Sequence, residues 1–212
     1  SSPISPFQTV NTTTMWVFGY GSLVWKADFK YEYKLVGYIK GYLRRFYQHS
    51  IDHRGVPEKP GRVVTLIQSD DPDSIVWGVA YKIRIEDIDQ VTKHLDYREK
   101  NGYSKKTVIF YPKDESQAPF SLTLYVATEE NESYAEDIAK QIISCTGPSG
   151  QNKEYVYNLA AAMRELVPDV NDEHLYALEE AVELLNVIKI HVVSLYVDKQ
   201  QLGISNFIIL VR

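Results

Sequence analysis

The stretch Trp16-Val-Phe-Gly-Tyr-Gly-Ser-Leu23 passes from three apolar residues directly into a turn that contains two glycines. The apolar residues predict a short buried strand. The glycines let the backbone adopt positive φ and leave its amides open to a ligand. Consecutive N–H groups turned to one side can bind an anion without any lysine. A strand end followed by a purely structural turn explains the same residues equally well, so the rest of the chain has to decide.

The composition is that of a globular chain with a full core. Its 212 residues suit one domain, and 44% of them are hydrophobic. The formal net charge of −5 argues against a nucleic-acid-binding protein, because binding to phosphates depends on summed positive charge. No apolar run reaches the roughly 20 residues that a membrane-spanning helix needs. We therefore expect neither nucleic acid nor membrane as a partner.

The cysteine content indicates the cellular compartment, and the N-terminal residues indicate where the folded domain begins. Cys145 is the single cysteine, which excludes an internal disulfide and a cysteine-rich metal cluster and favours a reducing, cytoplasmic location. Residues 1–14 carry no charge and lack the basic start and apolar centre of a signal peptide. We interpret them as a leader or disordered extension, with Met15 as a native start.

Apolar and β-branched runs separated by turn signals predict the strands. A loop rich in proline and glycine covers residues 52–61, and Asp71-Pro-Asp73 marks a turn. Short connections of this kind favour an antiparallel or mixed sheet, which could close into a small barrel. The predicted strands are residues 34–47, 62–68, 75–83, 105–112 and 120–128.

Helical spacing of apolar residues indicates four helices, most of them late in the chain. The first carries Ile85, Ile88, Val91 and Leu95 at intervals of three or four residues. Strands first and helices later indicate an α+β fold. The other predicted helices are residues 133–144, 153–166 and 172–185.

The C-terminal residues are unlike the charged helix before them. Residues 187–197 and 206–211 are apolar and β-branched. They could form an added hairpin, an oligomer contact or an aggregation-prone extension, and the sequence leaves the oligomeric state open. We expect a single domain over residues 15–185 and a C-terminal extension of unknown role over residues 186–212.

Glu99 stands where the apolar stripe of the first predicted helix would continue. Ile88, Leu95 and Glu99 are separated by seven and four residues, so all three lie along nearly one face. A glutamate at such a position is costly unless it is paired or used. Burial and the negative end of the helix dipole would both make it hold a proton more tightly, as a general base working near neutrality requires. The alternative is a frayed last turn in which Glu99 reaches water or pairs with a neighbouring cation.

Other catalytic patterns are absent from the sequence. No G-x-S-x-G nucleophile motif and no H-E-x-x-H metal spacing occur, and Val24 stands where a dinucleotide fingerprint needs its third glycine. We therefore expect no metal and no dinucleotide. Four arginines gather around one loop and suit bidentate recognition of a carboxylate, although pairing with the acidic surface is the alternative. They are Arg44, Arg45, Arg54 and Arg62.

Several ordered motifs resemble the ChaC-type, glutathione-specific γ-glutamylcyclotransferases, from Met15 to about residue 185. Each motif is weak alone, but the order and separations of the set match. One departure is Tyr47, where the family commonly has tryptophan. The motifs are Phe18-Gly-Tyr-Gly-Ser-Leu23, Arg44-Arg-Phe46, Asp52-His-Arg-Gly55, Pro60-Gly-Arg62, Arg98-Glu99 with Gly102-Tyr103, and Gly147-Pro-Ser-Gly150 with Asn152 and Glu154-Tyr155.

The resemblance implies a γ-glutamylcyclotransferase-like β-barrel with flanking helices. It also implies cleavage of glutathione to 5-oxoproline and cysteinylglycine without a cofactor. Glu99 matches the family's catalytic glutamate. The residues that match its substrate loop are Val17, Phe18, Gly19, Tyr20, Gly21, Ser22 and Leu23.

The implied reaction suits these residues. The substrate's own α-amine attacks its γ-carbonyl and closes a lactam, so no covalent enzyme residue is needed. Glu99 would take a proton from the ammonium and return it to the departing cysteinyl nitrogen. The amides of the glycine turn would hold a carboxylate or the developing oxyanion. Tyr20 and Tyr155 either line the pocket or pack in the core, and Arg54 or Arg62 would meet the glycine carboxylate.

Two other functions stay open from the sequence. The substrate could be another γ-glutamyl amino acid or amine, or the pocket could belong to a non-catalytic small-molecule-binding protein. The glutamate on the apolar stripe argues against the second.

Overall fold

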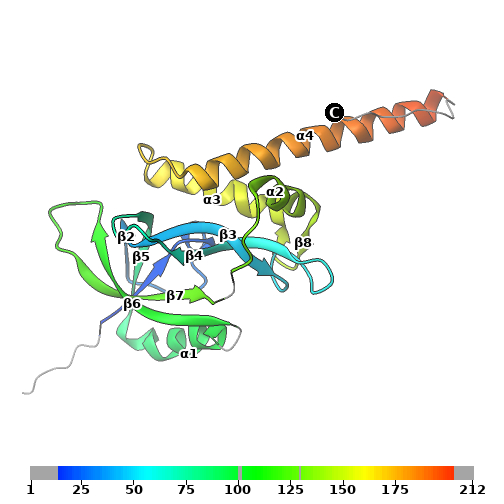
Figure 1. Cartoon of the computed structure of the whole chain (residues 1–212). Helices are drawn as coiled ribbons and strands as arrows, with labels where there is room; N and C mark the ends of the chain where they lie inside the picture. Colours follow the sequence, from blue (N-terminus) through cyan, green and yellow to red (C-terminus); the bar gives the residue numbers. More distant parts are fainter. Residues whose placement is uncertain (1–13, 100–101, 129, 203–212) are drawn as a thin grey trace, which may run out of the picture.

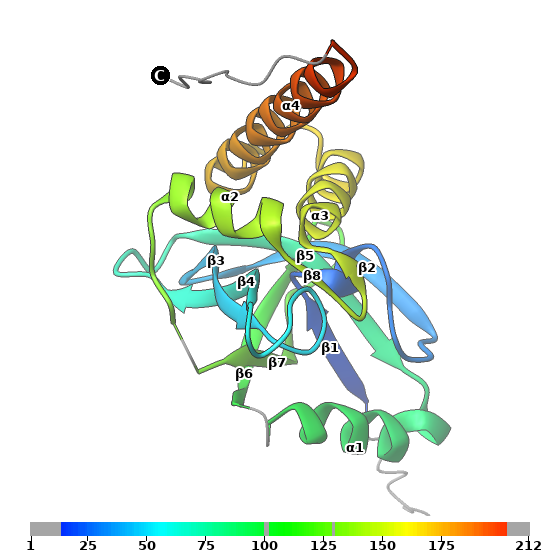
Figure 2. The ribbon, with the colours of Figure 1, turned by 90° about the vertical axis from the view of Figure 1, so that its right-hand side faces the viewer.

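The computed structural model describes residues 14–99, 102–128 and 130–202, and only the backbone of residues 98–99 and 198–202. The expected leader, Thr14 apart, and the apolar run 206–211 lie outside these residues. What is described divides into a β-barrel with one helix on one side and three helices on the other (Figures 1 and 2).

Five strands close into a barrel in the order β1-β5-β2-β6-β7. Neighbouring strands are antiparallel except β1 and β7, which run parallel where Val17 pairs with Thr123. The predicted α+β fold with a small mixed barrel is therefore confirmed. The barrel strands are β1 (Met15–Gly19), β2 (Tyr33–Lys40), β5 (Ile75–Ile83), β6 (Tyr103–Pro112) and β7 (Phe120–Ala127).

Aromatic side chains and glycines share the core of the barrel. The rings of Phe18 and Phe110 lie 5.9 Å apart, and both side chains are almost fully buried. Gly37 and Gly78 are paired across β2 and β5, and a Cβ on either would collide with one of these rings. The small residues thus leave the space that the phenyl rings fill.

A separate two-stranded ribbon of β3 (Tyr42–Ser50) and β4 (Gly61–Gln68) packs beside the barrel. The sequence predicted one strand over residues 34–47, and this is wrong because Gly41 interrupts it. Gly41 has a φ of +83°, a conformation that L-residues rarely adopt and that turns β2 into β3. The ribbon also carries a register shift between Arg45 and Gln48, which marks a bulge.

The helices lie on opposite sides of the barrel, with α1 on one side and α2, α3 and α4 together on the other (Figures 1 and 2). Short strands β8 (Thr146–Gly147) and β9 (Gly150–Gln151) join α2 to α3. Ile138, Leu159 and Leu175, one from each of the three grouped helices, are fully buried. The helices are α1 (Ile88–Glu99), α2 (Ala135–Ser144), α3 (Asn152–Leu166) and α4 (Glu173–Leu202).

Helix α4 runs well past the predicted end at residue 185 and extends beyond the body of the molecule (Figure 1). The hairpin considered for residues 187–197 is therefore wrong. The proximal half of α4 is held by Leu175, Leu178 and Val182, all fully buried. Once a helix is nucleated, each added residue costs little free energy, even when it is β-branched. The distal half exposes apolar side chains, among them Ile190 at 58%. Within the described residues, no helix is long and apolar enough to span a membrane.

Candidate active site

The loop after β1 is held by a buried arginine. Arg44, only 3% exposed, donates from Nε to the Tyr20 carbonyl over 2.9 Å. Its Nη1 donates to Asp172 over 2.6 Å and its Nη2 donates to the Trp77 carbonyl. One guanidinium therefore ties the loop to β5 and to the residue before α4, and a planar fork of donors suits such a three-way contact.

Tyr20 points into the protein. Its ring is buried beside Phe18, and its hydroxyl donates to the Tyr125 carbonyl over 2.8 Å. The Tyr125 hydroxyl in turn donates to Asp96 of α1 over 3.2 Å. The loop is thus connected through β7 to the C-terminal half of α1.

The two glycines of the loop are required by close packing. Neither has positive φ, and Gly21 has a φ of −125°, so the predicted left-handed backbone is wrong. A Cβ on Gly21 would lie 2.7 Å from the Tyr155 hydroxyl and 2.8 Å from a methyl group of Val64. A Cβ on Gly19 would lie 2.8 Å from that of Leu23. The loop can approach Tyr155 only because Gly21 has no side chain.

The carbonyl groups of the loop turn inward. Besides the Tyr20 carbonyl, that of Gly21 accepts from Val24, that of Ser22 from Lys26, and that of Leu23 from the Tyr81 hydroxyl. Val17 and Phe18, earlier in the predicted substrate loop, belong to the barrel core. Among the described residues, the backbone N–H groups of Gly21 and Ser22 have no protein acceptor. Because its carbonyl groups are bound inside the protein and these two N–H groups are not, the loop offers hydrogen-bond donors to an anion.

Tyr155 is the fourth residue of α3 and is 5% exposed. Its hydroxyl oxygen accepts from the Val64 amide over 3.3 Å, and its ring meets Trp25 edge to face. Burial raises the pKa of Tyr155 above that of a free tyrosine, so the hydroxyl keeps its proton. Tyr155 thus brings an O–H donor against Gly21.

Arg62 supports the bulge in β3. The bulge takes Phe46 and Tyr47 out of the strand ladder and leaves their backbone groups in need of partners. Arg62 donates to the carbonyls of Phe46 and Asn131, and its Nε donates to the Gln141 amide oxygen over 2.8 Å. Its partners are neutral groups of the protein interior, not the acidic surface.

Arg54 lies closer to the loop. Its Nη1 donates to the Gln151 carbonyl over 3.0 Å and lies 3.6 Å from the Glu154 carboxylate. Its guanidinium carbon is 5.8 Å from the centre of the Tyr155 ring. Burial lowers the pKa of Arg54 below its usual value, although Glu154 opposes this. Of the two arginines expected to meet a carboxylate, the structure places Arg54 beside Tyr155.

Glu99 is the last residue of α1, and its side chain lies outside the described residues. Val91 and Leu95 of the same helix are buried, as the predicted stripe requires, and Glu99 follows Leu95 by one turn. Four residues later, the Tyr103 hydroxyl accepts from Gln48 over 2.6 Å. Four extended residues span at most about 14 Å, so the Cα atoms of Glu99 and Tyr103 lie within about that distance of each other.

Tyr103 connects this region to the loop. It lies near enough to Tyr155 to contribute to the raised pKa of that residue. The roles of Arg44, Gln48 and Tyr103 were missed from the sequence. For Arg44 a signal existed, because it stands two residues before Phe46 and so on the same face of a strand. For Gln48 no signal existed, because a bulge sets its direction.

No group of three or more histidine, cysteine or acidic side chains that could hold a metal ion occurs in the part of the chain that the structure describes.

Known proteins share this fold and are similar to this chain in sequence. The family described as ChaC-like protein matches residues 15–185. The chain is 47% identical over 176 residues to glutathione-specific gamma-glutamylcyclotransferase 1 of Danio rerio, covering 80% of this chain and 89% of that one. It is 46% identical over 178 residues to the Mus musculus protein of the same name, covering 81% and 79%. A crystal structure of a glutathione-specific gamma-glutamyl cyclotransferase from yeast has a TM-score of 0.73 at 29% identity, covering 80% of this chain and 96% of that one.

Proposed function

The chain belongs to the ChaC-like family, and from this premise we propose that it is a γ-glutamylcyclotransferase that cleaves glutathione to 5-oxoproline and cysteinylglycine. The observation that carries the proposal is the loop over residues 19–23. Its carbonyls are bound by the protein, while the N–H groups of Gly21 and Ser22 have no protein acceptor among the described residues and lie beside the Tyr155 hydroxyl.

The reaction needs positioning more than reactive side chains. Amine and γ-carbonyl belong to one substrate molecule, and holding two groups in reacting geometry is worth effective concentrations of about 10⁵–10⁸ M. A loop fixed by Arg44 can supply this by binding one folded conformer. The N–H groups of Gly21 and Ser22, with Tyr155, hold the γ-glutamyl carboxylate or the developing oxyanion. Arg44 acts through the loop and is a positioning residue.

Glu99 moves the proton in this proposal. It takes a proton from the substrate ammonium, and the free amine attacks the γ-carbonyl. Glu99 returns this proton to the cysteinyl nitrogen as its bond to the carbonyl carbon breaks. The second proton of the attacking nitrogen passes through water to the released amine, so the protons balance and no redox partner or cofactor is needed. Support comes from the stripe of Val91 and Leu95, which directs the helix face of Glu99 toward the barrel.

Arg54 is our candidate for the glycine carboxylate of glutathione. It carries its charge beside Tyr155, whereas the hydrogen bonds of Arg62 stabilise the β3 bulge. We also propose action in the cytosol, because the one cysteine, Cys145, is a free thiol and the relatives' substrate, glutathione, is abundant under reducing conditions.

Product analysis tests the proposal directly. Purified protein is incubated with glutathione, and 5-oxoproline and cysteinylglycine are quantified by mass spectrometry, with and without EDTA. We expect equal amounts of the two products and no effect of the chelator. γ-Glutamylalanine is compared in parallel, and faster turnover of it would mean that another γ-glutamyl compound is the substrate. Binding of glutathione without either product would indicate a non-catalytic binding protein.

A further inference from the structure

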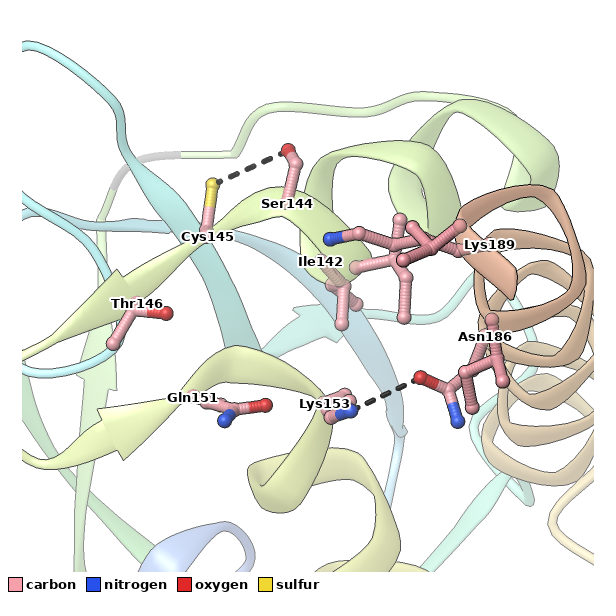
Figure 3. Close-up of a pocket in the computed structure, with 11 residues that line it drawn as sticks. Ile142, Ser144, Cys145, Thr146, Gln151, Lys153, Asn186 and Lys189 are labelled. Carbon is pink, nitrogen blue, oxygen red and sulfur yellow. Dashed lines mark hydrogen bonds between the residues drawn. The ribbon is translucent and has the colours of Figure 1, made fainter. Parts of the chain in front are cut away.

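A hollow lies between α2 and α4, away from the loop that follows β1. Its volume is about 440 Å³, and it is bounded by the end of α2, the short strands β8 and β9, the first turn of α3 and the middle of α4 (Figure 3). Neither Arg44, Tyr155 nor any residue of the loop lines it. Cavities of roughly 300–1,000 Å³ are the usual size for small-molecule sites.

The charge in this cavity is of one sign. Its charged lining residues are Lys153 and Lys189, and no acidic residue lines it. Lys153 donates to the Asn186 side chain over 3.0 Å, and among the described residues neither ammonium is paired with a carboxylate. In a chain of net charge −5, an uncompensated pair of ammonium groups facing one hollow attracts an anion.

The two lysines enter from different walls. Figure 3 shows the Lys189 side chain reaching across from α4 toward Ser144, while Lys153 lies beside Gln151 on the α3 side. The amides of Gln151 and Asn186 add neutral hydrogen-bonding groups on that side. This arrangement suits a head group with several acceptor oxygens.

The remaining lining is apolar. Ile143 of α2 lines it with part of its surface exposed, and Ile190 and Val193 of α4 line it with 58% and 54% of their surface exposed. Covering these side chains releases water from apolar surface, and a purely ionic ligand would leave them uncovered. The cavity thus combines a cationic side with an aliphatic side.

We propose that this cavity binds a small organic anion with a short aliphatic body. The carboxylate or phosphate head group lies between Lys153 and Lys189, and the aliphatic part packs between Ile143 and Ile190. The proposal stands on the cavity alone and does not depend on the cyclotransferase reaction.

The cavity adjoins the candidate active site through one turn of helix. Lys153 faces the cavity, whereas Tyr155, two residues later, faces the loop, because side chains two positions apart point to opposite sides of a helix. The carbonyl of Gln151 accepts from Arg54. A bound anion therefore contacts the same turn that carries Tyr155.

Calorimetry with chosen probes tests the proposal. Octanoate and octyl phosphate are titrated into the full chain, with octanol as the uncharged control of equal length. We expect one octanoate or octyl phosphate per chain, and at least tenfold weaker binding of octanol. The stronger of the two anions identifies the preferred head group. No binding of either anion at millimolar concentration, or equal binding of octanol, would overturn the proposal.

Variants locate the site. Lys153→Gln and Lys189→Gln are each expected to weaken octanoate binding about tenfold, because each removes one charge-assisted contact. Lys140→Gln is the matched control, since Lys140 lies on α2 outside the cavity and pairs with Asp137. Thermal unfolding of each variant confirms that it is folded. Unchanged octanoate affinity in the Lys153→Gln/Lys189→Gln double variant would contradict the site.

Discussion

The loop after β1 and the cavity beside α4 treat charge in opposite ways. At the loop, the Arg44 guanidinium is fully enclosed and each of its nitrogens has a protein partner. In the cavity, Lys153 and Lys189 face open space without a carboxylate among the described residues. Buried charges with fixed partners hold a backbone in one geometry, whereas exposed charges can follow a ligand. The contrast is between a loop whose backbone a buried charge holds in one geometry and a cavity whose lysine side chains can move to meet a ligand.

The largest effect is expected where packing at the loop is closest. Gly21→Ala would bring a methyl group against the Tyr155 hydroxyl and Val64, so the loop must move. A displacement of about 1 Å at a reacting geometry can lower a rate about 100-fold, and we expect at least that loss of 5-oxoproline formation.

Gly41→Ala is the matched control for Gly21→Ala. Gly41 has positive φ in the turn between β2 and β3, so alanine there strains the backbone and lowers the free energy of unfolding by about 1 kcal/mol. Activity should be retained. If both variants lose activity in proportion to their stability, the loop has no special requirement for glycine.

A smaller effect is expected when the charge that orients Arg44 is removed. Asp172→Asn keeps a side-chain oxygen that can still accept from the Leu175 amide at the start of α4, but it leaves Arg44 without its counter-charge. We expect the free energy of unfolding to fall by about 3 kcal/mol and KM for glutathione to rise about tenfold, since the loop loses an anchor. Urea denaturation and steady-state kinetics measure the two effects.

Glu179→Gln provides the comparison for Asp172→Asn. Glu179 pairs with Arg164 at the protein surface, where such a pair contributes at most about 1 kcal/mol. Its KM should equal that of the parent. An Asp172→Asn variant indistinguishable from Glu179→Gln in both measurements would show that Arg44 does not need its buried partner.

The pH dependence of the free energy of unfolding depends on His174, which lies where α4 meets β3. Burial, with repulsion from Arg45, lowers the pKa of His174 to about 4, and its Nε2 accepts from the Phe46 amide at the bulge. In the unfolded chain, His174 takes up a proton below about pH 6.5, whereas in the folded chain it does so only below about pH 4. Stability is therefore lost as the pH falls through this window, by about 3 kcal/mol.

His174→Gln tests this assignment, because glutamine can accept the same hydrogen bond without titrating. We expect a flatter dependence of the free energy of unfolding on pH between 6.5 and 4. His191→Gln, on the exposed part of α4, should keep the slope of the parent. Equal slopes for all three proteins would exclude His174 as the source.

The smallest effect is expected on the distal half of α4. Ile190→Ser removes an exposed apolar side chain, so the free energy of unfolding should change by no more than about 0.5 kcal/mol. The rate with glutathione should stay within about twofold, while octanoate binding weakens. A large loss of cyclotransferase activity in Ile190→Ser would show that the two regions are not separate.

The barrel strands were predicted from β-branched and aromatic runs between clear turn signals, and closure into a γ-glutamylcyclotransferase-like barrel was implied by the family resemblance. The sequence predicted secondary structure less well where contacts between distant residues outweigh the local pattern. Residues 187–197 are β-branched, yet they extend a helix that Leu175 and Leu178 anchor. Gly41 divides a run that looks like one continuous strand. Its positive φ makes the turn, and the residues beside it in the sequence give no sign of this.

For the site, the sequence predicted a role for the loop over residues 19–23, and the reason given for its glycines was partly wrong. Gly21 is needed for its missing side chain, which depends on Tyr155, more than 100 residues later. The arginines were taken together as candidates for a carboxylate, but the structure separates Arg44 at the loop, Arg62 at the bulge and Arg54 beside Tyr155. Such assignments depend on tertiary partners that spacing does not encode.

The central claim is that Glu99 transfers the proton while the loop positions the substrate. The direct measurement is the rate of 5-oxoproline release from glutathione by Glu99→Gln, with Glu86→Gln, an exposed glutamate just before α1, as the control. Loss of a general base lowers a rate by about 10²–10⁴-fold, so we predict a fall in this range for Glu99→Gln and the parent rate for Glu86→Gln. A folded Glu99→Gln protein that releases 5-oxoproline as fast as the parent would contradict the account.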